Sequence, residues 1–69
     1  MMGSLSEIVP SVMMIINELD MQVQIKQIAT DTAHVQFDTL AARTIATRYL
    51  LEAGLAVRYT EERVLEASF

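Results

Sequence analysis

His34 is the only histidine in the chain, and histidine is the side chain best suited to proton transfer near neutral pH. It alternates with Gln36 on a segment with strand periodicity, and Asp38 follows two residues later. Residues on one face of a strand recur about every 6.5–7 Å, so His34 and Asp38 would lie about 13 Å apart. That distance is too long for a shared proton or metal ion. We expect a solvated hairpin histidine; the alternative is a base paired with a residue distant in the sequence.

Other patterns that carry catalysis are missing from the sequence. None of the four serines has a nucleophile-elbow pattern, and two glycines cannot form a phosphate-cradling loop. One histidine without cysteine cannot supply the usual ligands of a structural zinc ion. The carboxylates of Glu61, Glu62 and Glu66 have the spacing of a solvated helix face. We therefore expect a non-enzymatic protein with no catalytic residue, cofactor or metal site.

Four arginines in the second half of the chain suggest an alternative function in nucleic-acid binding. They are Arg43, Arg48, Arg58 and Arg63. Arg43 and Arg48 would be about 140° apart on a helix, so they do not form one clamp. The formal net charge of −4 also opposes binding driven by phosphate contacts. A nucleic-acid-binding regulator is therefore the second hypothesis rather than the first.

Composition limits the size and surroundings of the protein. The 69 residues allow one small domain, and a chain of this length buries too little surface to be very stable. The hydrophobic content of 52% is high, there is no cysteine for a disulfide, and oligomerisation is the remaining common way to gain stability. The longest apolar run, Val12 to Ile16, is too short to span a bilayer. No basic residue precedes Lys26, so the charged start of a secretory signal is missing, and we expect a cytoplasmic protein without membrane contact.

A central helix over residues 38–54 is the element most clearly marked in the sequence. Asp38 or Thr39 can cap its N-terminus, and Gly54 can take the left-handed conformation after its last turn. One broad side is apolar and is expected to cover a sheet, with Ala41, Ala42, Ile45, Ala46, Tyr49, Leu50 and Ala53. On the opposite side, Leu40 and Leu51 align with two threonines in a narrow stripe.

The N-terminal segment predicts a second helix. Residues 1–3 are expected to be disordered, and Ser4 and Glu7 have the spacing of a capping box. Pro10 fits only the first turn, so the regular helix should begin near Val9 or Pro10 and end by Asp20. Two heptads of apolar residues form what we call the heptad face: Leu5, Ile8, Val12, Ile15 and Leu19.

Strand periodicity occupies the remaining segments. Met21 to Ile28 alternates, with an irregularity at Gln27–Ile28 that suggests a bulge, and a turn at residues 30–32 leads into a second strand. A short third strand is expected around Val57 and Tyr59, followed by a short C-terminal helix from Thr60, for which a longer strand through Leu65 is the alternative. The predicted fold is a single α+β domain: helix, β-hairpin, central helix, short third strand and short C-terminal helix. The apolar face of the hairpin should pack on the central helix.

The surplus of apolar surface and the lack of catalytic sets predict a small protein-interaction module: a regulator, adaptor or assembly subunit. We expect self-association as a homodimer or a higher even oligomer, beside an unidentified protein partner. The heptad face is the favoured interface because it is wide and uncharged, and the stripe with Leu40 and Leu51 is the competing one. Least favoured is an enzyme with a site assembled between subunits around His34.

Overall fold

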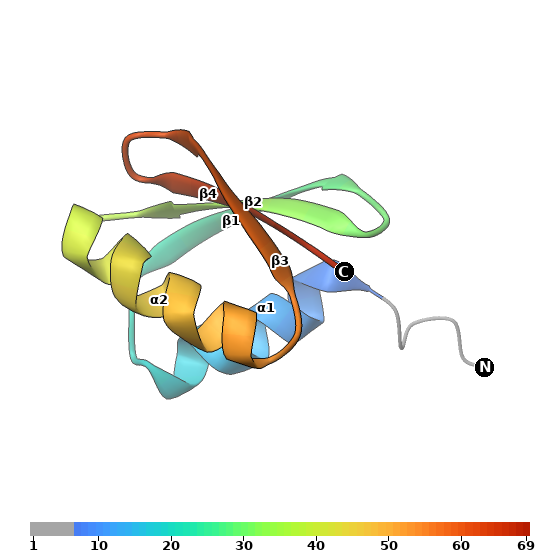
Figure 1. Cartoon of the computed structure of the whole chain (residues 1–69), viewed down its shortest axis with the longest axis horizontal. Helices are drawn as coiled ribbons and strands as arrows, with labels where there is room; N and C mark the ends of the chain where they lie inside the picture. Colours follow the sequence, from blue (N-terminus) through green and yellow to red (C-terminus); the bar gives the residue numbers. More distant parts are fainter. Residues whose placement is uncertain (1–6) are drawn as a thin grey trace.

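Two helices cover one face of a four-stranded antiparallel sheet (Figure 1). The computed structural model describes residues 7–69, so Leu5, the capping box at Ser4 and the predicted disorder of residues 1–3 lie outside the described residues. The elements are α1 (Ile8–Glu18), β1 (Val23–Ala29), β2 (Thr32–Phe37), α2 (Leu40–Glu52), β3 (Ala56–Glu61) and β4 (Val64–Ser68). The predicted α+β class is confirmed. Within this part of the chain, no helix is long and apolar enough to cross a membrane.

Helix α1 begins at Ile8, slightly earlier than predicted. Pro10 lies in the first turn, where backbone N–H groups have no acceptor within the helix and its missing donor costs nothing. The helix ends before Asp20, whose φ of 56° lies in the left-handed region. The N–H of Asp20 donates to the carbonyl of Asn17 at 3.2 Å and closes the last turn.

Helix α2 has the predicted cap at its N-terminus but buries a narrower face than predicted. Thr39 is the capping residue, because its hydroxyl accepts from the N–H of Ala42 at 3.0 Å. Ala46 and Leu50 are completely buried, whereas Tyr49 is 45% exposed. The helix therefore rests on the sheet through a few residues, and much of its apolar surface faces solvent.

The C-terminus of α2 forms a Schellman motif. Gly54 has the predicted left-handed conformation, with a φ of 94°. Its N–H donates to the carbonyl of Leu51 at 3.0 Å, and the N–H of Leu55 donates to the carbonyl of Leu50 at 3.1 Å. Leu50 and Leu55 are both buried in the core, which is the hydrophobic contact that accompanies this motif.

The sheet has the strand order β1-β2-β4-β3. In the β1–β2 hairpin the pairing shifts between Gln27 and Ala29, which confirms the predicted irregularity. β4 lies between β2 and β3 and is antiparallel to both, so β2 and β3 run in the same direction with one strand between them.

The predicted C-terminal helix is wrong, because residues 64–68 form the strand β4. Leu65 and Phe69 have the i, i+4 spacing of a helix, but burial follows a period of two: Leu65 and Ala67 are buried, and Glu66 between them points to the other face. β4 gains hydrogen-bonded neighbours on both sides, which no local helix propensity can match. The alternative of one longer strand through Leu65 is also wrong, since the chain turns at residues 62–63.

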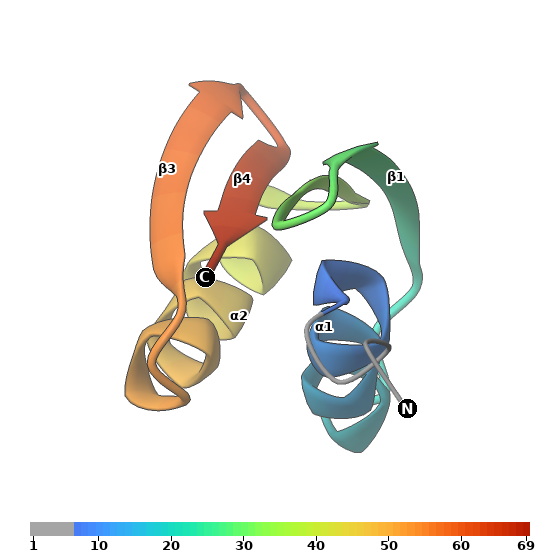
Figure 2. The same cartoon turned by 90° about the vertical axis from the view of Figure 1, so that its right-hand side faces the viewer.

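The core lies between the two helices and the sheet (Figure 2). In that view α1 lies toward β1 and α2 toward β3. β1 contributes partly buried side chains, including Val23 and Ile25. The fully buried apolar side chains are Ile8, Val12, Ile16, Ala33, Val35, Phe37, Ala46, Leu50, Leu55, Leu65 and Ala67. The predicted packing of the hairpin on the central helix is confirmed for β2 only. β1 packs on α1 instead, because α1 shares the same core and covers that side of the sheet.

Candidate functional site

On the sheet face without helices, a single row across the sheet holds one charged or titratable side chain from each strand. Lys26 of β1 is opposite His34 of β2, His34 is opposite Glu66 of β4, and Glu66 is opposite Arg58 of β3. We call these four residues the cross-strand row. Their side chains share one face because directly paired residues in an antiparallel sheet project to the same side.

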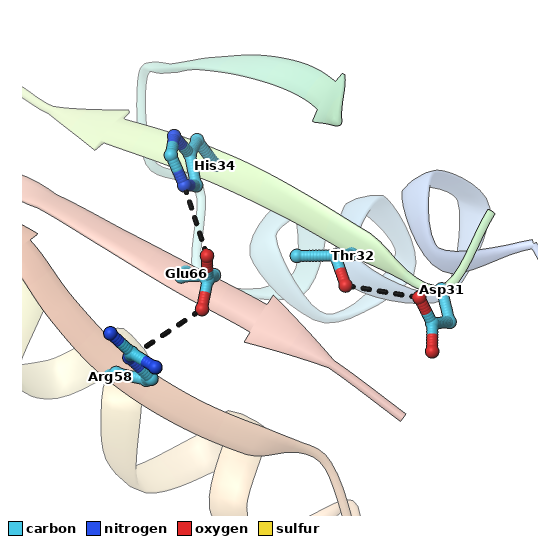
Figure 3. A network of polar contacts seen from close by, with 5 residues as sticks. All are labelled: Asp31, Thr32, His34, Arg58 and Glu66. Carbon is cyan, nitrogen blue, oxygen red and sulfur yellow. Dashed lines mark hydrogen bonds and ion pairs between the residues drawn. The ribbon is translucent and has the colours of Figure 1, made fainter. Parts of the chain in front are cut away.

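Glu66 lies between His34 and Arg58 in the cross-strand row (Figure 3). Its Oε2 lies 3.3 Å from Nε2 of His34, and its Oε1 lies 3.6 Å from Nε of Arg58. The carboxylate is partly sheltered, with its side chain 25% exposed, while that of Arg58 is 76% exposed. The prediction that Glu66 belongs to a solvated helix face is wrong, because the residue lies on the central strand β4.

His34 has the distant partner that the sequence left as an alternative. Glu66 is 32 residues away in the chain, and the imidazole is part-buried rather than fully solvated. Figure 3 shows the other ring nitrogen pointing away from Glu66. A carboxylate beside one nitrogen fixes the orientation of an imidazole and leaves the second nitrogen for a ligand.

The arrangement positions a histidine but does not complete a catalytic set. Among residues 7–69, Glu66 is the hydrogen-bond partner of His34, and no hydroxyl bonds to its ring. A nucleophile would have to lie within about 2.6–3.2 Å of this base. The same residues contain no group of three histidine or acidic side chains that could hold a metal ion.

A pocket of about 380 Å³ lies on the helix-free face beside the cross-strand row. This volume is within the range of sites for small ligands. Residues from all four strands line this cavity, which we call the sheet pocket. They are Gln24, Ile25, Lys26, His34, Gln36, Thr60, Glu61 and Val64. Glu61 pairs with Val64 in the register and so shares its face.

The four arginines of the nucleic-acid hypothesis are not brought together. Arg43 points from α2 to the β3–β4 turn, where its Nη1 donates to the carbonyls of Glu61 and Glu62 at 3.1 and 2.6 Å. Arg63 donates to the carbonyl of Asp38 at 3.1 Å. These two guanidinium groups therefore form hydrogen bonds that connect backbone segments distant in the sequence. Of the others, Arg58 lies on the sheet beside Glu66, and Arg48 lies exposed on α2.

The predicted interface residues fall into two groups. Ile8 and Val12 of the heptad face are completely buried in the core of the single chain, and Ile15 and Leu19 pack at its edge. Leu40 and Leu51 are exposed on α2, by 45% and 53%.

Sequence reasoning did not find the sheet pocket. Its walls come from segments far apart in the chain, and neutral side chains such as Gln24 and Thr60 carry no motif. One available signal was the alternation of residues 64–68, in which Val64, Glu66 and Ser68 form one face. Read as a strand, this segment would have placed Glu66 on the polar face of a sheet.

Comparisons of the chain with protein-family models, curated proteins and solved structures give no match.

Proposed function

We propose that the protein is a small non-enzymatic interaction module that associates with a second copy of itself through α2. The observation that carries this proposal is a stripe along that helix whose two leucines are exposed, by 45% and 53%. The stripe consists of Leu40, Thr44, Thr47 and Leu51. Large apolar side chains gathered on an exposed face are typical of an interaction surface, whereas isolated ones are common on any protein.

The hydroxyls of the two threonines in the stripe form hydrogen bonds within the chain, so the stripe is less polar than its sequence suggests. The hydroxyl of Thr44 donates to the carbonyl of Leu40 at 3.0 Å. The hydroxyl of Thr47 donates to the carbonyl of Arg43 at 2.7 Å and also lies 2.9 Å from the hydroxyl of Tyr59. Because these hydroxyls already have hydrogen-bond partners in the chain, burying the stripe would not leave a polar group unpaired.

The spacing of the stripe supports a symmetric pair of helices. Its residues are separated by four, three and four positions, which reads the same in both directions. A two-fold axis between Ile45 and Ala46 would place Leu40 against Leu51 of the second copy, and Thr44 against its Thr47. Such self-complementarity is what an isologous dimer requires.

The heptad face is less suited to this role. Ile8 and Val12 already fill the core beneath the sheet, so exposing them to a second copy would open the domain. The cost of removing one such side chain from a core is about 2–5 kcal/mol for leucine or isoleucine. The proposed interface therefore uses Leu40 and Leu51, which packing within one chain leaves exposed.

The test measures the mass of the protein in solution by light scattering across a concentration series. The unmodified protein should be a dimer, and Leu51→Glu should be a folded monomer, because an unpaired charge would be buried against Leu40 of the second copy at both ends of the contact. Met14→Glu is the matched control: Met14 is 67% exposed on α1, away from the stripe, and its replacement should leave the dimer intact. A monomeric unmodified protein at high concentration would end the proposal, and so would dissociation by Met14→Glu alone.

A further inference from the structure

We propose that the sheet pocket binds a short zwitterionic peptide, with the ligand carboxylate at Lys26 and the ligand ammonium at Glu61. This site lies on the face opposite the helices, so it goes beyond the proposed self-association and does not depend on it. The argument rests on which charges remain available in the pocket, on the groups between them and on the distance they span.

Within the cross-strand row, the charged groups other than Lys26 are paired with one another and are not available to a ligand. Glu66 is in contact with both His34 and Arg58. The guanidinium of Arg58 neutralises the negative charge of the Glu66 carboxylate. Lys26 and Glu61 line the sheet pocket, and neither takes part in an ion pair within residues 7–69. One free cation and one free anion in a single pocket match a ligand that carries both charges.

The groups between these two charges are suited to an amide backbone. Gln24 and Gln36 face each other on β1 and β2, and each offers amide donors and an acceptor to the pocket. Thr60 adds a hydroxyl from β3, and Val64 adds an apolar contact from β4. Peptide N–H and carbonyl groups would find partners here, whereas a purely apolar ligand would leave these side chains unpaired.

The distance between the charges sets the length of the ligand. Lys26 lies on the edge strand β1 and Glu61 on the opposite edge strand β3, three strand spacings or about 14 Å apart across the sheet. The register aligns Glu61 with Gln24, two residues from Lys26, so the two backbones are about 16 Å apart. Both side chains are long enough to reach inward and shorten this gap. An extended peptide spans about 3.3–3.6 Å per residue, so two or three residues would cover about 7–10 Å. A single amino acid is too short to contact both ends.

Calorimetric titration of the full chain with alanine peptides tests the proposal. Ala-Ala or Ala-Ala-Ala should bind, and free alanine should bind at least tenfold more weakly. Acetylation of the amino end or amidation of the carboxyl end should each weaken binding about tenfold, because each removes one charge-assisted hydrogen bond. Equal affinity for the blocked and free peptides, or no binding of either peptide, would overturn the proposal.

Two pocket variants assign the ends of the ligand. Lys26→Gln should abolish the preference for a free carboxylate while keeping that for a free ammonium, and Glu61→Gln should do the reverse. Glu62→Gln is the matched control, since Glu62 is the next residue along the chain and does not line the pocket. If Glu62→Gln weakens binding as much as Glu61→Gln, the effect is one of overall charge and the assignment is wrong. Light scattering on the same samples separates this outcome from a failure of dimerisation.

Discussion

His34 and Glu66 meet across the β2–β4 pair, with 3.3 Å between Nε2 and Oε2, although 32 residues separate them in the chain. The contact joins the first hairpin to the second at the centre of the sheet (Figure 3). Because both side chains are partly exposed, we expect a coupling free energy of about 0.5 kcal/mol between them. A double-mutant cycle with His34→Gln and Glu66→Gln, followed by urea unfolding, measures this value.

The control is a second double-mutant cycle, in which Lys26→Gln takes the place of His34→Gln and is combined with Glu66→Gln. Lys26 lies next to His34 in the cross-strand row but does not touch Glu66, so its coupling to Glu66→Gln should be close to zero. Equal coupling in both cycles would mean that the interaction is a general effect of charge on the sheet.

Arg43 is expected to stabilise the fold by fixing the β3–β4 turn on α2. Its guanidinium donates to two turn carbonyls and lies over the ring of Tyr59, with 3.6 Å between Cζ and the ring centroid. Arg43→Met should lower the free energy of unfolding by about 1–3 kcal/mol, because both carbonyls lose a charged donor and the ring loses its cation. Chemical denaturation measures the change. Arg48→Met, on the exposed side of the same helix, should change it by less than about 0.5 kcal/mol.

Gly54 is required for its backbone conformation rather than for space. A Cβ at this position would meet nothing within 4 Å, but the φ of 94° strains any other residue. Gly54→Ala should therefore destabilise the protein by about 1–2 kcal/mol without changing its core. Asp20→Gly should have the opposite sign, since Asp20 has a φ of 56° after α1 and glycine would relieve that strain. Thermal unfolding of both variants provides the comparison, and equal signs would contradict this account.

Ile16 is expected to act as a core residue of the single chain. It is almost completely buried, so Ile16→Ala should lower the free energy of unfolding by about 2–5 kcal/mol. That loss could unfold a domain of this size, and Ile16→Val provides a milder test with an expected loss of about 0.5–1.5 kcal/mol. Met14→Ala, on the exposed side of the same helix, should cost much less. Similar losses for Ile16→Val and Met14→Ala, measured by urea unfolding, would place α1 outside the core.

Much of the local structure follows from the sequence by itself, because short-range constraints determine it. The hydroxyl of Thr39 and the missing side chain of Gly54 mark the two ends of α2, and both act on backbone groups within four residues. Pro10 limits the start of α1 to one turn for a steric reason that needs no tertiary contact. The break in alternation at Gln27–Ile28 likewise marks the irregular pairing of β1 with β2.

Only the tertiary structure decided the state of residues 64–68 and the composition of the candidate site. The segment around Leu65 has both helical and strand patterns, and the choice came from pairing with β2 and β3, two strands that no local signal identifies as its neighbours. That pairing places Glu66 against His34 and Glu61 across the pocket from Lys26. Such contacts depend on strand order and register, which are determined by burial of the whole sheet and not by the spacing of residues along the chain.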